Sequence, residues 1–269
     1  MRIGTNGREV KLPPTSRYAP LMGLSVLLCT PSRDGRCSMH YAASLAETVK
    51  LLNDHGIAVA IAKSDNSCFI DLSRNLFIQR LMKEINTYTH LLQIDDDMSW
   101  SPSSILEMLL KDKEFIAGLG RKKTMEMQFA GEMVVEDGQP IGEIGDCEET
   151  TIIKMERVGG AFTLMKKSAI EKLIEKFPDH KNEGLGYTFY RLEYDKKGLI
   201  TEDYYFCRLL KKAGIDIWCY PNVTMGHLGS FDYKGNYFDY LKKCKEQEEM
   251  KEIFEEAKEA EHGISKEGV

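Results

Sequence analysis

Three consecutive carboxylates, Asp95, Asp96 and Asp97, follow the short apolar run "HLLQI" in the sequence. Because like charges repel one another, some partner must offset the cost of placing them together. If the strand that this run predicts continued through them, Asp95 and Asp97 would share one side of the strand and Asp96 would point the other way. A divalent cation such as Mg²⁺ or Mn²⁺ would remove the repulsion, since hard ions bind carboxylate oxygens.

The three aspartates could also have a role that needs no metal. They could cap the next helix, but Ser101 and Pro102 already supply a hydroxyl cap and a proline at the first helical position. They could form a solvated charge run, although they follow a buried strand rather than a polar helix face. A calcium loop starting at Asp95 would need glycine at Trp100 and glutamate at Leu106, which excludes that loop. The pattern therefore favours an open metal site that leaves coordination positions for phosphate oxygens.

Alternating strands and helices are predicted to position these aspartates. Buried strands are predicted from apolar runs bounded by turn residues, over 23–30, 57–63, 90–94, 114–120, 159–165 and 215–221. Helices are predicted from apolar residues at helical spacing, over 39–56, 71–86, 103–112, 167–177, 202–213 and 237–260. Asp137 and Gly138 predict a hairpin turn between short strands. The alternation predicts an α/β fold whose mostly parallel central sheet has helices on both faces and binds ligands at the carboxyl ends of its strands.

Composition predicts one large globular domain with two short extensions. With 42% apolar residues among 269, the chain can bury a core of ordinary size. Residues 1–20 form a polar arm and 21–235 the domain. Residues 236–269 form an acidic helix, whose incomplete apolar stripe predicts packing on the domain or on a partner subunit of a homo-oligomer.

Charge and hydropathy also narrow the partners and the location of the protein. The formal net charge of −6 argues against nucleic acid as a partner, since such proteins usually present a basic face. No apolar run approaches the ~20 residues that span a bilayer, and residues 1–23 lack the apolar core of a signal peptide. We therefore expect a soluble, cytoplasmic protein whose seven scattered cysteines are reduced thiols.

The aspartate cluster at the end of a predicted strand resembles the D-x-D motif of the nucleotide-sugar glycosyltransferases of the GT-A fold, particularly their family 2-like branch. In that family the last aspartate of the motif holds the metal on the donor diphosphate. The resemblance places Asp97 on the metal and Asp95 near the ribose or the metal, and it counts Asp95 and Asp96 among the donor-binding residues. It covers about residues 24–229 and implies a Rossmann-like GT-A domain over 21–235.

Three further stretches carry the resemblance, the third of which contains Gly159 and Gly160. "TEDYYFCRLLKKAG" is similar to the x-E-D motif of the family, with Glu202 and Asp203 as the match, and the aspartate serves as the base in inverting members. A carboxylate is needed there because an acceptor hydroxyl is a poor nucleophile until its proton is taken. Alternatively, the acidic pair only favours the dipole of the helix that it opens. His227 in "PNVTMGHLGS" matches an additional metal ligand of many relatives, although a lone histidine can equally be structural.

The resemblance also implies a nucleotide subsite. Its residues lie in the loops after the first two strands and on the following helix: Thr30, Pro31, Arg33, Asp65 and Arg74. Arg74 could equally be a surface ion-pair partner. Gly159 and Gly160 could let the backbone approach the donor sugar or the acceptor, or could only begin a strand tightly. The basic run at 121–123 could meet diphosphate charge or form a solvated loop.

Taken together, the resemblance implies a metal-dependent glycosyltransferase that uses Mn²⁺ or Mg²⁺. It would move a sugar from a nucleotide-diphosphate sugar, with UDP favoured over GDP, to a glycan or other hydroxyl acceptor, with inversion. One alternative is a sugar nucleotidyltransferase, which would ordinarily carry a phosphate loop rich in glycine and basic residues after the first strand, and "TPSRDGRCS" matches this poorly. Another is a nucleotide- or sugar-binding module without catalysis.

Overall fold

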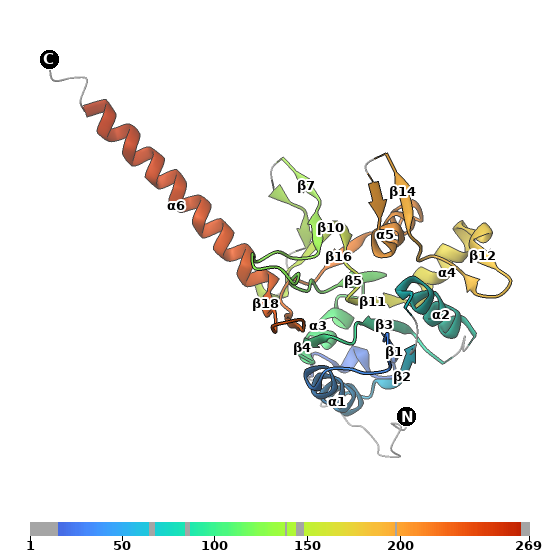
Figure 1. The fold of residues 1–269 in the computed structure, drawn as a ribbon. Helices are drawn as coiled ribbons and strands as arrows, with labels where there is room; N and C mark the ends of the chain where they lie inside the picture. Colours follow the sequence, from blue (N-terminus) through green and yellow to red (C-terminus); the bar gives the residue numbers. More distant parts are fainter. Residues whose placement is uncertain are drawn as a thin grey trace.

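The structure, a computed structural model, describes residues 16–64, 68–83, 87–137, 139–143, 148–196 and 198–264, and in the last helix side chains as far as residue 251. Its fold is α/β, with a central sheet that has helices on both faces (Figure 1). The predicted fold class is therefore confirmed. This is also the arrangement that the resemblance to the GT-A fold implied.

Helices form close to the predicted ranges because their apolar residues recur at helical spacing. They are α1 (Met39–Asp54), α2 (Ile70–Lys83), α3 (Ser103–Leu110), α4 (Lys167–Lys176), α5 (Glu202–Lys212) and α6 (Tyr237–Ile264). Short 3₁₀ turns lie at Ala19–Leu21, Glu148–Thr150 and Pro178–His180. Helix α3 has no side-chain cap, because the Ser101 hydroxyl pairs with the Ser103 hydroxyl instead, so the predicted cap is wrong.

The central sheet combines two directions of strand. Its order is β2 (Ala58–Ser64), β1 (Ser25–Pro31), β3 (His90–Ile94), β11 (Phe162–Lys166), β5 (Phe115–Ala117), β16 (Ile217–Cys219), β10 (Ile152–Val158) and β6 (Gly131–Met133), with β9 (Gly142–Glu143) also paired to β10. Strands β2, β1 and β3 are parallel, as are β5 and β16. Strand β11 runs antiparallel between β3 and β5, so it starts at the edge where its neighbours end.

Strand β2 lies at the edge of this sheet, and of its residues only Ala62 is buried. The prediction that 57–63 forms a buried strand is therefore wrong, because an apolar run alone does not tell an edge strand from a central one. Smaller sheets pair β17 (Thr224–His227) with both β4 (Met98–Trp100) and β18 (Gly235–Asn236), β7 (Val135–Glu136) with β8 (Gln139–Pro140), β12 (Lys181–Asn182) with β13 (Gly186–Tyr187), and β14 (Glu193–Asp195) with β15 (Gly198–Ile200). The β7–β8 pair is the hairpin predicted around Asp137.

Two apolar cores lie on opposite faces of the sheet. Alternation along β1 sends Val26 and Leu28 to the core under α1 and α3, while Leu27 and Cys29 reach the core under α2, α4 and α5. All four side chains are fully buried. The sheet is therefore held from both sides, which gives its strand ends fixed positions.

Helix α6 begins on the domain and then leaves it (Figure 1). The Phe129 ring lies 4.9 Å from that of Tyr237 and 5.3 Å from that of Tyr240, between ring centroids. Farther along, Met250 is 59% exposed. The predicted helix is confirmed, whereas its packing against a partner subunit stays a prediction.

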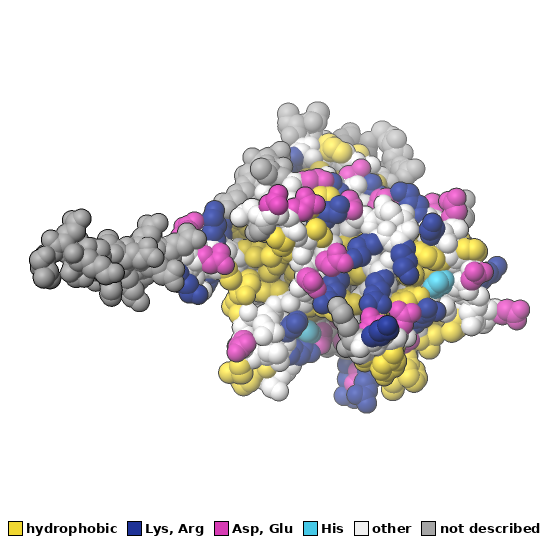
Figure 2. Space-filling model, turned by 90° about the horizontal axis from the view of Figure 1, so that it is seen from above, with side chains coloured by type: hydrophobic (Ala, Val, Ile, Leu, Met, Phe, Trp, Pro, Cys, Tyr) yellow, Lys and Arg dark blue, Asp and Glu magenta, His cyan; other side chains and the backbone are white. Residues whose placement is uncertain are grey.

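One face of the protein carries side chains of both signs of charge. On the face shown in Figure 2, Lys and Arg side chains are interspersed with Asp and Glu side chains. Among the described residues, every helix is too short or too polar to cross a membrane.

The buried His90 on β3 predicts a pH-dependent loss of stability. Burial, helped by Lys166, lowers the pKa of His90 from 6.5 to about 4. Between these values the unfolded chain binds a proton that the folded protein excludes, so stability is lost as the pH falls through this range. The lowered pKa corresponds to about 3 kcal/mol in the free energy of unfolding. Urea titrations at pH 7 and pH 4 should show that His90→Gln loses this much less than wild type, and equal losses would contradict the assignment.

Candidate active site at the carboxyl end of the sheet

Three segments far apart in the sequence meet at one edge of the central sheet. Strands β1 and β3 are parallel neighbours, so the loop carrying Arg33 and the segment 95–97 leave the sheet together. Strand β11 starts at the same edge because Phe162 pairs with Ile94 in the antiparallel direction. Gly160 therefore lies beside the aspartates, at the edge formed by the carboxyl ends of β1 and β3, which is where open α/β sheets bind ligands.

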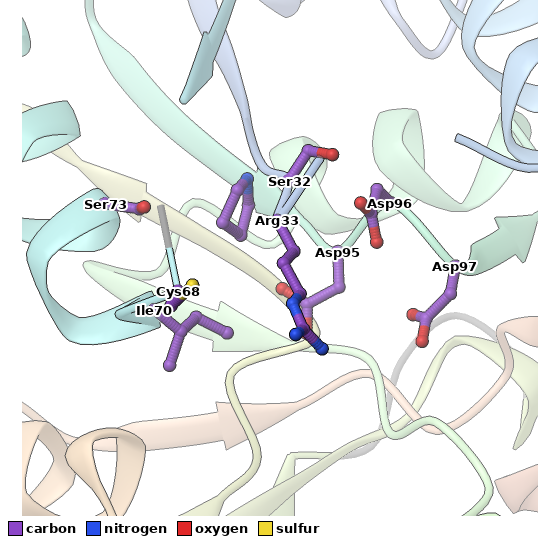
Figure 3. A pocket seen from close by; sticks show the side chains of 9 residues that line it. Ser32, Arg33, Cys68, Ile70, Ser73, Asp95, Asp96 and Asp97 are labelled. Carbon is purple, nitrogen blue, oxygen red and sulfur yellow. The ribbon is translucent and has the colours of Figure 1, made fainter. Parts of the chain in front are cut away.

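The three aspartates occupy a turn rather than a continuation of the strand. Strand β3 ends at Ile94, and the Met98 N–H donates to the Asp95 carbonyl oxygen at 3.2 Å. The predicted alternation, with Asp96 pointing away, is therefore wrong, because a turn does not keep the two-residue period of a strand. All three line one cavity of about 220 Å³, whose other lining residues are Pro31, Ser32, Arg33, Cys68, Ile70 and Ser73 (Figure 3).

Asp97 is the aspartate with two basic side chains beside it. Its Oδ2 lies 2.5 Å from the Lys123 ammonium and 3.5 Å from Nε2 of His227. Although burial alone would raise it, the hydrogen bonds from His227 and Lys123 hold the pKa of Asp97 below its ordinary value. The other oxygen, Oδ1, is buried without a hydrogen-bond partner. Asp97 is thus held as a carboxylate with one acceptor oxygen to spare.

His227 reaches Asp97 through the small sheet. On β17 it pairs with Met98 on β4, and the next residue, Leu228, donates its N–H to the Asp97 carbonyl oxygen at 2.8 Å. The Arg121 carbonyl oxygen lies 2.9 Å from Nδ1 of His227, which turns Nε2 toward the aspartate. Burial lowers the pKa of His227, but the hydrogen bond to Asp97 and the carbonyl of Arg121 raise it above its ordinary value.

Asp95 is bound by a buried arginine. The Arg74 guanidinium donates to Asp95 Oδ1 at 3.0 Å, to Gln93 Oε1 at 3.0 Å and to the Gly160 carbonyl oxygen at 2.7 Å. Arg74 is 1% exposed, so it is not the surface ion-pair partner that was one alternative. The hydrogen-bonded amino groups of Arg74 are occupied by other residues of the protein. A direct contact of Arg74 with a nucleotide stays a prediction.

Glu202 and Asp203 open helix α5, as predicted, and both connect to this network. Arg74 Nε lies 3.8 Å from Glu202 Oε1. Asp203 Oδ2 accepts the Gly160 N–H at 3.1 Å, and its Oδ1 accepts the Tyr204 N–H at 2.8 Å. Burial, followed by the charge of Asp203, raises the pKa of Glu202. The acidic pair therefore does more than favour the dipole of α5, because Glu202 lies near Arg74 on α2 and Asp203 binds the backbone of Gly160 before β11.

Gly160 links the two ends of the site through its backbone. Its carbonyl oxygen is bound by Arg74 and its N–H by Asp203. A Cβ at this position would lie 2.8 Å from Nη2 of Arg74, which leaves no room for a side chain. Close approach of Arg74, rather than of a ligand, is the observed reason for glycine here.

The predicted nucleotide-binding residues lie in different surroundings in the structure. Pro31, Arg33 and Asp96 line the cavity. Thr30 is buried instead, and its hydroxyl is hydrogen-bonded to the Tyr41 hydroxyl. Asp65 lies outside the described residues. The nucleotide contacts themselves stay predictions.

The predicted metal ligands are only partly brought together. Within the part of the chain that the structure describes, no three His, Cys, Asp or Glu side chains are grouped to hold a metal ion. Asp97 Oδ2 and His227 Nε2 face each other, and Asp97 Oδ1 has no hydrogen-bond partner, so this carboxylate fits an open cation site completed by phosphate oxygens. Asp95 is engaged by Arg74, so its role on the metal stays a prediction.

Sequence reasoning left the role of Lys123 open and missed Gln93. Lys123 contacts Asp97, which lies 26 residues earlier in the chain. The basic run 121–123 was compatible with both a diphosphate contact and a solvated loop. Gln93 is fully buried and binds Arg74. A polar residue inside the apolar run "HLLQI" was the available signal, because a buried amide requires a partner.

Several solved structures resemble this chain at low sequence identity. No protein-family model and no curated protein matches it. A197 from STIV is 14% identical, over 77% of this chain and 86% of its own, with a TM-score of 0.46. The inositol-1-phosphate CTP transferase from T. maritima is 8% identical over 76% and 88%, with a TM-score of 0.41. A glycosyltransferase involved in the glycosylation of the major capsid of PBCV-1 is 10% identical over 59% and 68%, with a TM-score of 0.33. Likeness at this level does not bear on activity.

Proposed function

We propose that the protein is a metal-dependent glycosyltransferase that moves a sugar from a nucleotide-diphosphate sugar to an acceptor hydroxyl. The observation that carries the proposal is the connection between two pairs of carboxylates, Asp95 with Asp97 and Glu202 with Asp203. Asp95, at the cavity, and Glu202, at the start of α5, both lie against the Arg74 guanidinium. One pair can serve the donor while the other serves the acceptor.

The donor end of the site contains Asp97 and His227, which would hold Mn²⁺ or Mg²⁺. When bound, the cation would neutralise the charge that develops on the leaving diphosphate. Pro31, Arg33 and Asp96 line the cavity next to Asp97 and would contact the nucleotide. We favour UDP over GDP only because UDP is the commoner donor base in the resembling family.

The acceptor end contains Asp203 as the proposed base. The N–H groups of Gly160 and Tyr204 hold its carboxylate in place, so it keeps one orientation relative to the cavity edge. Asp203 would take the proton of the acceptor hydroxyl while the new glycosidic bond forms, which predicts inversion at the anomeric carbon. Glu202 would stay close to Arg74, and its negative charge would contribute to the electrostatic environment of the acceptor end.

Product analysis by NMR would test the proposal against a sugar nucleotidyltransferase. The protein would be incubated with Mn²⁺ and either UDP- and GDP-sugars together with sugars that offer a free hydroxyl as acceptor, or a sugar 1-phosphate with UTP and GTP. A glycosyltransferase releases a nucleoside diphosphate and a glycosylated product or free sugar. Pyrophosphate release in the second mixture would favour the nucleotidyltransferase, and no turnover in either would favour a binding module.

We also propose that a second copy of this chain covers the apolar stripe of residues 236–269. Helix α6 extends beyond the domain, and Met250 on it is exposed. Its acidic composition suits a protein partner better than an anionic lipid surface. Light scattering of the purified protein should give the mass of an oligomer, and the mass of one chain would exclude this contact.

A further inference from the structure

Lys123 occupies the position at Asp97 that the proposed cation needs. Its ammonium lies 2.5 Å from Asp97 Oδ2, the same oxygen that faces Nε2 of His227 at 3.5 Å. A Cβ at Gly229 would lie 3.1 Å from Cδ of Lys123, so the lysine stem passes over that glycine on its way to the aspartate. The contact joins the loop after β5 to the turn after β3.

Lys123 and a divalent cation cannot both stay at this oxygen. A cation bound by Asp97 and His227 would lie within contact distance of the ammonium, and two positive charges at that separation repel each other strongly. The lysine side chain is 36% exposed, and a flexible four-carbon stem lets its head move. Lys123 can therefore leave Asp97 without rearrangement of the buried core.

A displaced Lys123 has a suitable new partner close by. A donor diphosphate bound next to Asp97 would bring several phosphate oxygens to the cavity, and an ammonium binds these as a point charge. Metal alone would have to displace Lys123 and leave it without its partner. Metal together with a diphosphate would displace it and supply a replacement.

We infer that Lys123 and the divalent cation exchange at Asp97: the lysine neutralises the aspartate in the free protein and moves to the donor diphosphate when the cation binds. The inference rests on the proposed function, which supplies the cation and the diphosphate. It makes Lys123 the source of cooperativity between metal and nucleotide, because each favours the state in which the lysine has left Asp97.

Titration of Mn²⁺ followed by electron paramagnetic resonance tests this exchange without any assay of activity. The variants are Lys123→Met and, as a matched control, Lys83→Met, which removes the same charge from an exposed position at the end of α2. Without nucleotide, Lys123→Met should bind Mn²⁺ about tenfold more tightly than wild type, since a charge-assisted hydrogen bond no longer competes. With Mn²⁺ saturating, its affinity for UDP or GDP, whichever wild type binds, should fall about tenfold. Lys83→Met should match wild type in both titrations.

The outcomes separate this inference from the proposed function. If wild type binds nucleotide with Mn²⁺ while Lys123→Met binds Mn²⁺ no more tightly, the exchange is wrong and the proposed function stands. Unchanged nucleotide affinity in Lys123→Met would overturn the transfer of the lysine to the diphosphate. If wild type binds neither Mn²⁺ nor a nucleotide, the proposed function fails and the exchange fails with it. Thermal melting of each variant would establish that it is folded before it is titrated.

Discussion

Asp203→Asn should lower turnover by about 10²- to 10⁴-fold while leaving donor binding unchanged, since a general base contributes this much. Asparagine keeps the shape of aspartate, and its oxygen can still accept the N–H of Gly160 or Tyr204. It cannot take the acceptor proton. Donor consumption in the presence of acceptor measures turnover, and calorimetry with the nucleotide measures binding.

Glu202→Gln is the matched control for this substitution. It makes the same chemical change one residue away, next to Arg74 rather than Gly160. We expect a smaller loss of turnover, because Glu202 is not the proposed base. A larger loss in Glu202→Gln than in Asp203→Asn would exchange the two roles. A product that retains the donor configuration would remove Asp203 from the role of base.

Arg74→Met should lower the free energy of unfolding by about 3–5 kcal/mol, the typical cost of removing one partner from a buried ion pair. The substitution leaves Asp95 without its cation, and it leaves Gln93 Oε1 and the Gly160 carbonyl oxygen without these donors. Chemical denaturation of wild type and variant measures the difference. Arg74→Lys should recover only part of it, because an ammonium cannot reproduce the planar fork of a guanidinium.

Arg80→Met provides the comparison on the same helix. Arg80 is exposed, and exposed ion pairs contribute less than about 1 kcal/mol. A similarly small loss in Arg74→Met would mean that the buried network does not stabilise the site. The denaturation slope should stay the same in all four proteins, since a change in slope would indicate an altered denatured state.

The elements and their alternation could be predicted because they depend on local patterns. Strand β3 ends at Ile94 as the run "HLLQI" predicts, and helix α5 begins at Glu202 as predicted. The order of strands could not be predicted in the same way. Strand β11 inserts antiparallel between β3 and β5, and β2 lies at an edge, because pairing depends on contacts between distant segments.

The candidate site was predictable in residue type but not in its connections. Asp97 and Glu202 were identified from motifs, yet nothing near Arg74 in the sequence indicates that it contacts Gly160, 86 residues away. Lys123 is a similar case, because a basic run after a strand is compatible with a solvated loop. Burial decides the case of Arg74 and the contact with Asp97 decides the case of Lys123, and both are properties of the folded chain.

Calorimetric titration with UDP and GDP, each with and without Mn²⁺, tests most directly whether Asp97 binds a donor diphosphate through a cation. The titration would use wild type, Asp97→Ala and, as a control, Asp216→Ala, which removes an exposed aspartate on the strand-forming segment before β16. We predict that wild type and Asp216→Ala bind one nucleotide only with Mn²⁺, and that Asp97→Ala loses this binding. Absence of nucleotide binding in wild type under every condition, or equal binding by Asp97→Ala, would contradict the proposed function.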